Sequence, residues 1–309
     1  MILQRTIKKA TTISGIGLHS GQRINLRMRP AIANTGIIFH RTDQKQTVDI
    51  KVCPENVVDT RMATVIGHQG VTVSTIEHFM SALAAFGIDN LHIDIDGPEV
   101  PILDGSAAYF IREIQRAEVK KLTRNRKFIS IQKPLEIIEG EKRIRIIPSR
   151  FFRISFDIAF DHPTIAVQKY SVKLSPESFC KEIASARTFG FLHEVEQLKS
   201  MGLARGGSLE NAVVIDKNGV MNPEGLRYPD EFVRHKILDA VGDFSLLGVS
   251  LLGHIKAYKS GHDLNAKMVQ KIKDNPSHWT YVEFSEQALR EAQRKEVELI
   301  TPDLAWDKA

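Results

Sequence analysis

One short segment places a histidine and two carboxylates at intervals of four residues. In FVRHKILDAVGD, residues 232–243, His235 is followed by Asp239 and Asp243, and Lys236 stands directly after the histidine. Side chains four apart project from one face of a helix with Cβ atoms about 6 Å apart, so His235 and Asp239 could share one metal ion. An exposed ion pair explains the same spacing, and this segment alone leaves both interpretations open.

A second histidine stands at the start of an otherwise apolar helical pattern. In STIEHFM, Glu77 directly precedes His78, and packing alone does not explain a polar pair in this place. The competing interpretation is a capping box, in which Glu77 reaches back to the amide of Ser74. Taken by itself, this stretch favours the capping box.

A third histidine, His262, follows a turn formed by Ser260 and Gly261 in AYKSGHDLN. Taken alone, it is a solvated loop residue. Two histidines and one aspartate, however, supply the three protein ligands that a hydrolytic zinc ion needs beside an open position for water. Glu77 and His262 would then be the proton-transfer groups. Because these ligand types also suit Fe²⁺, the pattern indicates a hydrolase that uses Zn²⁺ or Fe²⁺.

The elements that carry these residues alternate between strand and helix patterns. Apolar residues recur at helical spacing in TIEHFMSALAAFG, where Gly87 ends the pattern, so a helix should carry Glu77 and His78. A second amphipathic helix should begin at Ser106. Strand-like alternation marks four runs in this part of the chain: RINLRMRP, GIIFHRT, VTVSTI and LHIDID.

A similar order of elements returns after about residue 128. KFISIQ, RIRIIP and FRISFDIAF alternate as strands do, SPESFCKEIASA is helical, and the strand NAVVID precedes a helix beginning near Pro229. The strand LLGHIKAYK and a helix from about Leu264 complete this part. We therefore predict an α+β fold of two similar domains, residues 1–124 and 125–309, with the boundary in a basic stretch.

Composition narrows the compartment and the partners. The 309 residues contain no run long and apolar enough for a membrane span and no secretory signal pattern, which predicts a cytoplasmic protein without an integral membrane segment. Cys53 and Cys180 lack any metal-binding spacing, so a metal must be held by nitrogen and oxygen. The formal charge of +5 fits an anionic partner, but the basic residues are scattered, so nucleic-acid binding is only a distant alternative.

Several long segments, in order along almost the whole chain, resemble one enzyme family. They are QRTIKKATTISGIGLHSG, RPAIANTGIIFHRTD, STIEHFMSALAAFGIDN, PEVPILDGSAAYF, ARTFGF, DEFVRHKILDAVGD and YKSGHDLN. From about residue 1 to about 285 the chain is similar to the zinc-dependent UDP-3-O-acyl-N-acetylglucosamine deacetylases of lipid A biosynthesis. The resemblance implies two domains, each a sheet layered with helices, that face each other across a zinc site.

The resemblance also implies a reaction and a partner. The enzyme would hydrolyse the N-acetyl group of UDP-3-O-(3-hydroxyacyl)-N-acetylglucosamine to acetate and a free amine, the committed step of lipid A biosynthesis. Its partner would be this small-molecule UDP-sugar lipid rather than nucleic acid, and the chain would be a monomer. A zinc amidohydrolase of the same fold that acts on another N-acetylated sugar is the alternative.

Family roles carry over to individual residues of this chain. The resemblance places the metal on His78, His235 and Asp239. It makes Glu77 the general base in place of the cap, and it gives catalytic roles to three further residues: His262 as general acid and oxyanion-stabilising imidazolium, Asp243 as its charge partner, and Thr188 in ARTFGF as an oxyanion donor. Substrate contacts fall on Lys236 for the diphosphate and on Phe189 and His19 for the sugar.

The resemblance further implies an insert near residues 190–225 that forms an apolar tunnel for the acyl chain. Its expected walls are Leu192, Val195, Leu209 and Val214, with Gly207 leaving room for the chain. An ordinary amphipathic helix packed on the core gives much the same sequence pattern, so the tunnel rests on the resemblance alone.

Overall fold

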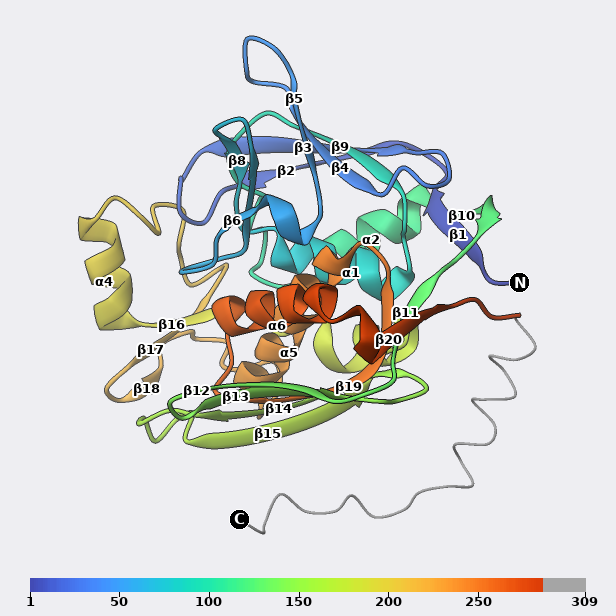
Figure 1. Cartoon of the computed structure of the whole chain (residues 1–309). Coiled ribbons are helices and arrows are strands. Elements are labelled where there is room, and N and C mark those ends of the chain that lie inside the picture. The colour runs from blue at the N-terminus through green and yellow to red at the C-terminus, as the bar shows by residue number, and fades with distance from the viewer. Residues whose placement is uncertain (286–309) are drawn as a thin grey trace.

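The computed structural model describes residues 1–285, in which two large sheets enclose a layer of helices (Figure 1). The first sheet has five strands in the order β2-β3-β9-β4-β5. Its pairs are antiparallel except β4 with β9, and its strands are β2 (Thr11–Ile16), β3 (Arg23–Pro30), β4 (Ile37–Arg41), β5 (Val48–Lys51) and β9 (Leu91–Ile95). The helices α1 (Glu77–Phe86) and α2 (Ala108–Ala117) lie against it.

The second sheet has seven strands and belongs to the later part of the chain. Its main path is β12-β13-β19-β11-β20, and β14 joins β19 to β15. The strands are β11 (Phe128–Ile131), β12 (Leu135–Glu139), β13 (Lys142–Ile147), β14 (Phe152–Ala159), β15 (Val167–Lys173), β19 (Ser250–Tyr258) and β20 (Trp279–Val282). The helices α5 (Glu231–Phe244) and α6 (His262–Asp274) cover the face that points toward the first sheet.

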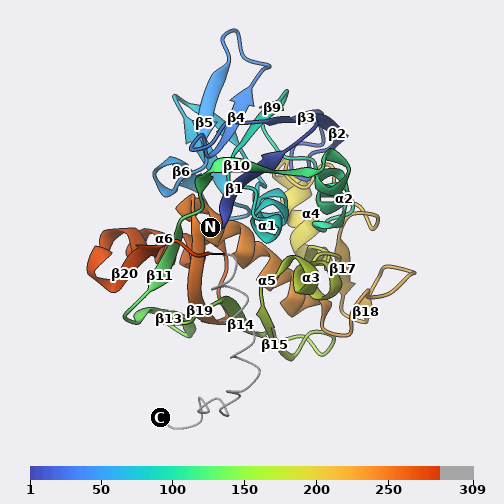
Figure 2. The same ribbon diagram turned by 90° about the vertical axis from the view of Figure 1, so that its right-hand side faces the viewer.

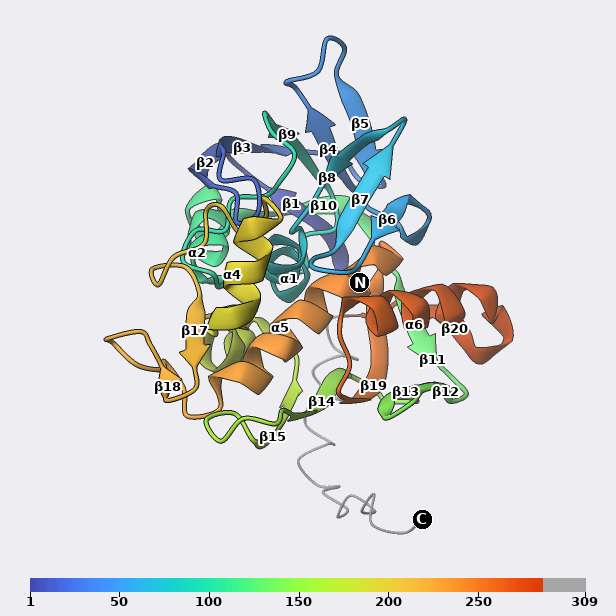
Figure 3. The same cartoon turned by 90° about the vertical axis from the view of Figure 1, so that its left-hand side faces the viewer.

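Smaller elements surround these layers. One three-stranded sheet consists of β6 (Val57–Asp59), β7 (Val65–His68) and β8 (Val71–Val73); another consists of β16 (Phe189–Phe191), β17 (Val213–Asp216) and β18 (Gly219–Val220). Figure 3 faces the side of the molecule that carries the sheet β6–β8 and the helix α4 (Leu192–Ser200). Short turns complete the chain: α3 (Pro176–Ser178), the π-helical η2 (Phe179–Ile183), and the 3-10 helices η1 (Pro54–Asn56), η3 (Ser245–Leu247) and η4 (Pro276–His278).

A two-stranded ribbon links the two halves. β1 (Leu3–Ile7) pairs antiparallel with β10 (Val119–Asn125), and the chain passes from β10 directly into β11 of the second sheet (Figure 2). The predicted boundary between residues 124 and 125 falls at the end of β10, and the division into two domains stays a proposal.

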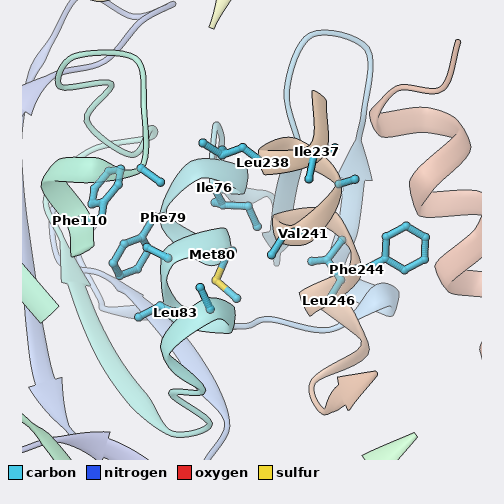
Figure 4. Packing of buried hydrophobic residues seen from close by; sticks show 14 of the residues in the cluster. Ile76, Phe79, Met80, Leu83, Phe110, Ile237, Leu238, Val241, Phe244 and Leu246 are labelled. Carbon is cyan, nitrogen blue, oxygen red and sulfur yellow. The ribbon is translucent and has the colours of Figure 1, made fainter. Parts of the chain in front are cut away.

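The hydrophobic core lies between the two sheets and is crossed by α1 and α5. Along β3 the residues Ile24, Leu26 and Met28 are fully buried and alternate with exposed polar ones, as expected for a strand with one face on the core. Figure 4 shows α1 packed against α5, with Met80 and Val241 among the apolar side chains between them. Burying each such side chain contributes about 1.5–3 kcal/mol to folding.

The predicted α+β fold is confirmed, and most elements lie where the sequence indicates. The prediction of a capping box at Ser74 is wrong. The amide of Ser74 donates to the carbonyl of Pro98, not to the side chain of Glu77. The last helix begins at His262 rather than near Leu264, so this histidine opens a helix instead of lying in a loop. The helix expected from Ser175 is a short turn followed by a π-helical one.

Candidate active site

Two helices from distant parts of the chain bring the three expected metal ligands together. His78 lies in the first turn of α1, while His235 and Asp239 lie one turn apart on α5. The helices approach closely at Gly242, where an added Cβ would stand 2.1 Å from the backbone oxygen of Glu77. Glycine at this position therefore lets the α5 backbone approach the start of α1.

The three side chains form one compact group. One ligand atom from each of His78, His235 and Asp239 lies within 4.8 Å of the others, and all three residues are buried. The Nε2 atoms of His235 and His78 lie 3.2 Å and 3.5 Å from Oδ1 of Asp239. Among residues 1–285, these residues make up the one cluster of three histidine, cysteine or acidic side chains arranged to hold a metal ion.

The protonation of His235 shows that a cation fits this group. Burial lowers the pKa of its imidazole to about 3, so the ring is neutral, and its Nδ1–H donates to the carbonyl of Ala186 at 3.0 Å. Nε2 therefore presents a lone pair, not a proton, to Oδ1 of Asp239. That oxygen is buried without a hydrogen-bond partner. A lone pair facing a carboxylate oxygen is repulsive unless a cation lies between them, and two imidazoles with one carboxylate suit a divalent metal.

Glu77 stands beside the ligand group, and its two oxygens have different neighbours. Oε2 accepts a hydrogen bond from the amide of Thr64 at 3.1 Å, and Oε1 lies 4.0 Å from Nε2 of His262. Burial raises the pKa of the carboxyl, although the charge of His262 opposes the rise. A carboxylate with a raised pKa accepts protons more readily than an exposed one, as a general base near neutrality requires.

His262 opens α6 and holds its ring against a buried carboxylate. Its Nδ1 lies 3.0 Å and 3.2 Å from the two oxygens of Asp243, which also accept hydrogen bonds from Thr64 Oγ1 at 2.6 Å and Asn265 Nδ2 at 2.8 Å. Burial lowers the pKa of the imidazole, but the carboxylates of Asp243, Glu77 and Asp239 together outweigh burial and raise the pKa to about 9, with Asp243 contributing most. The ring is therefore an imidazolium at neutral pH, with Nε2–H directed toward the ligand group.

These groups line a cavity of about 300 Å³. Nine of the expected site residues line it: Glu77, His78, His235, Asp239, His262, Thr188, Phe189, Lys236 and His19, the last of which lies on the loop after β2. Asp243 lies behind His262 and is 1% exposed. Lys236 donates to Oδ2 of Asp239 at 3.0 Å, and its ammonium lies 5.7 Å from the centre of the Phe189 ring.

The residues expected to form an acyl tunnel lie outside the lining of this cavity. Leu192 and Val195 belong to α4, Leu209 is 37% exposed, and Val214 is buried in β17. Gly207 lies in the loop between α4 and β17, close to Leu18 of the cavity wall. The helix and strands of the insert are present, and the tunnel itself stays a proposal.

The structure adds cavity residues that sequence patterns did not reveal. Thr60, Arg61, Met62, Ala63 and Lys142 line the cavity from the β6–β7 connection and from the start of β13. Lys142, for example, has no local sequence feature that distinguishes it from solvent-exposed lysines. These positions therefore became visible only when the two halves of the chain faced each other.

A buried ion pair holds the ligand-bearing helix. Arg187, between Ala186 and Thr188, donates from Nε to Oε1 of Glu231 at 2.9 Å, and both side chains are nearly inaccessible. Glu231 is the first residue of α5 and also accepts from the amides of Arg187 and Arg227. The segment ARTFGF therefore fixes both the start of α5 and the carbonyl that orients His235. The acidic residues at the start of α5 were visible in the sequence, but the pairing of Glu231 with Arg187 was not.

The sequence of this chain is similar to those of one family of known proteins. The sequence model of the family described as UDP-3-O-acyl N-acetylglycosamine deacetylase matches residues 4–274. The chain is 61% identical over 288 residues, 93% of each chain, to the UDP-3-O-acyl-N-acetylglucosamine deacetylase of Syntrophotalea carbinolica. It is 54% identical over the full length of both chains to the enzyme of the same name from Geobacter sp. strain M21, and 52% identical to that of Myxococcus xanthus over 90% of this chain and 89% of the relative. The chain belongs to the UDP-3-O-acyl N-acetylglycosamine deacetylase family.

Proposed function

We propose that this protein is a metal-dependent hydrolase that removes the acetyl group from UDP-3-O-acyl-N-acetylglucosamine in lipid A biosynthesis, and that the cavity described above is its active site. Family membership supports the reaction and the substrate. The observation that carries the assignment of the site is the buried oxygen of Asp239, which has no hydrogen-bond partner and faces the lone pair of His235.

His78, His235 and Asp239 would hold the metal, and we propose Zn²⁺, with Fe²⁺ as a second metal that the same ligands suit. When bound, such an ion polarises the acetyl carbonyl and lowers the pKa of water. The carbonyl of Ala186 keeps the His235 proton on Nδ1, so that Nε2 stays available as a ligand. Lys236 neutralises the second oxygen of Asp239.

Glu77 and His262 would divide the proton transfers between them. Oε1 of Glu77, which has no amide bound to it, takes a proton from the attacking water. Nε2 of His262 donates a proton to the leaving amine, and Asp243 keeps the ring charged beforehand. The same positive ring, together with the hydroxyl of Thr188 at the cavity wall, stabilises the negative charge that develops on the acetyl oxygen.

The cavity wall would hold the sugar nucleotide. Phe189 packs on His235 with 6.3 Å between ring centroids, which places an apolar surface beside the ligand group. The ammonium of Lys236 and the side chain of Lys142 supply positive charge for a diphosphate. His19 faces them from the other half of the chain. None of the helices formed by residues 1–285 has the length and apolarity for crossing a membrane.

A comparison of two variants tests the assignment. Glu77→Gln should keep the bound metal and lose about 10²- to 10⁴-fold in turnover, because it removes only the proton acceptor. His78→Ala should lose both metal and turnover. Metal content of the purified proteins and acetate release are the measurements, and His68→Ala, at an exposed histidine on β7, is the control. Equal metal loss in the Glu77 and His78 variants would assign Glu77 to metal binding or to the fold instead.

A further inference from the structure

Glu99 is a buried carboxylate that takes no part in the proposed chemistry. It lies in the segment PEVPILDG between β9 and α2 and is 1% exposed. Its Oε1 accepts hydrogen bonds from the amide of His19 at 2.9 Å and from Thr75 Oγ1 at 3.1 Å. Its Oε2 accepts from the amide of Ser20 at 2.9 Å. One side chain therefore joins the loop after β2 to the turn before α1.

The turn before α1 has a backbone conformation that needs such support. Thr75 has φ +57°, in the left-handed region that β-branched residues rarely adopt. It stands two residues before Glu77 and lines the cavity itself. Besides the Glu99 contact, the neighbouring Ser74 donates to the carbonyl of Pro98 at 2.9 Å and accepts from the amide of Val100 at 3.0 Å. The segment around Glu99 thus holds the turn that sets the direction of the Glu77 and His78 side chains.

The loop after β2 depends on the same carboxylate. Gly17 has no room for a side chain, since an added Cβ would stand 2.4 Å from Oε2 of Glu99. His19 lines the cavity, and its Nδ1 atom is buried without a hydrogen-bond partner. The outer side of the loop is held by backbone hydrogen bonds from Arg205 to His19 and from Gly206 to Leu18, so it also contacts the predicted acyl-chain insert.

We propose that Glu99 is a positioning residue that fixes two walls of the active site at once: the His19 wall, which contacts substrate, and the Thr75 turn, which aims Glu77. This inference rests on the proposed function. A purely structural carboxylate would affect stability alone. A positioning residue must change KM through one of its contacts and kcat through the other.

Substitutions at Thr75 isolate the contact with the turn. Thr75→Val keeps the branched shape but removes the hydroxyl that Glu99 accepts, whereas Thr75→Ser keeps the hydroxyl and is the matched control. Thr75→Val should lower kcat about tenfold or more, because small displacements of a catalytic group are costly, and should leave KM within about twofold. Thr75→Ser should lose less kcat than Thr75→Val, because its hydroxyl can still donate to Glu99.

Glu99→Gln isolates the contact with the His19 loop. The amide oxygen can still accept from His19 and Thr75, but the amide nitrogen meets the Ser20 amide as a second donor and forces the loop to shift. KM should rise about tenfold while kcat changes less, and affinity for the deacetylated product, measured by calorimetry, should fall by the same factor. Thermal melting shows whether each variant is folded at the assay temperature. If Thr75→Val is not folded, Glu99→Gln alone tests the proposal.

Two results would overturn the inference. If the folded variants have the same kcat, KM and product affinity as an active parent, Glu99 does not position either wall. If Thr75→Val and Thr75→Ser lose kcat equally, the hydroxyl contact is irrelevant. A parent protein that releases no acetate from the substrate would instead refute the proposed function. The two failures are therefore distinguishable.

Discussion

Asparagine in place of Asp243 should move the basic limb of the pH–rate profile toward neutrality. The proposed general acid works as an imidazolium. Burial lowers the pKa of His262, but Asp243, with smaller contributions from Glu77 and Asp239, raises it to about 9. Relative to the ordinary value of 6.5, this favours the charged ring by about 3 kcal/mol. At pH 7.5, about 97% of the rings are protonated with a pKa of 9, but only about 9% with a pKa of 6.5. Asp243→Asn should therefore lower kcat about tenfold at this pH.

The loss should disappear in acid, which separates it from general damage to the site. At pH 6 the parent and Asp243→Asn should differ less than about twofold, because both rings are then mostly protonated. The rate of acetate release, measured between pH 5.5 and 9.5, gives the acidic and basic limbs of the pH–rate profile. Thr64→Val is the control, since it removes another hydrogen bond to Asp243 and leaves the carboxylate beside His262. A basic limb at the same pH in parent and Asp243→Asn would refute the pairing of His262 with Asp243 as the source of the imidazolium.

The same pair predicts the pH dependence of stability in metal-free protein. Because the folded pKa of His262 lies above its unfolded value, the stabilisation is fully present below about pH 6.5 and is lost as pH rises through about 9. Urea unfolding of chelator-treated protein should show this decline in the parent and a smaller one in Asp243→Asn. An identical decline in both would contradict the assignment of the shift to Asp243.

Three further changes test the packing and the metal. Gly242→Ala should lower the free energy of unfolding by about 1–3 kcal/mol and weaken metal binding, because its Cβ forces α5 away from the backbone of Glu77. Urea unfolding and metal titration measure the two effects. An unchanged metal affinity would contradict the close approach of the two helices. Arg187→Met should cost about 3–5 kcal/mol in urea unfolding, since it leaves Glu231 buried without its partner; a loss below about 1 kcal/mol would show that Glu231 finds another. Removing the metal with a chelator should abolish acetate release and lower the melting temperature, and adding Zn²⁺ should restore both, because a ligand that binds only the folded state stabilises it.

Local patterns in the sequence were sufficient where neighbouring residues decide the outcome. The spacing of His235 and Asp239 places them on one helix face whatever the rest of the chain does, and the structure has them on α5. The apolar periodicity around His78 indicates the helix that α1 forms. Alternation along the runs such as RINLRMRP gives strands with one buried face. The resemblance to known deacetylases added the family, which comparison with other proteins confirmed.

Glu77 shows where a local pattern was misleading. Ser74 and Glu77 have the types and spacing of a capping box, but Thr75 takes a left-handed conformation and Ser74 bonds to Pro98. Glu77 instead accepts from the amide of Thr64, and its second oxygen lies 4.0 Å from Nε2 of His262. Pro98 and Thr64, the partners that Ser74 and Glu77 bond to instead, lie 10 or more residues away along the chain. The local spacing therefore gives no information about them.

What the sequence by itself determined is the set of elements, the residue types in the site and the family, because each depends on residues close together in the chain or on whole segments in order. Only the tertiary structure decided which atoms meet. His78 joins His235 and Asp239 because Gly242 lets α5 approach α1, and Glu99 joins His19 to Thr75 because two loops converge on one buried carboxylate. These contacts arise from packing between segments far apart in sequence, where neither periodicity nor spacing carries information.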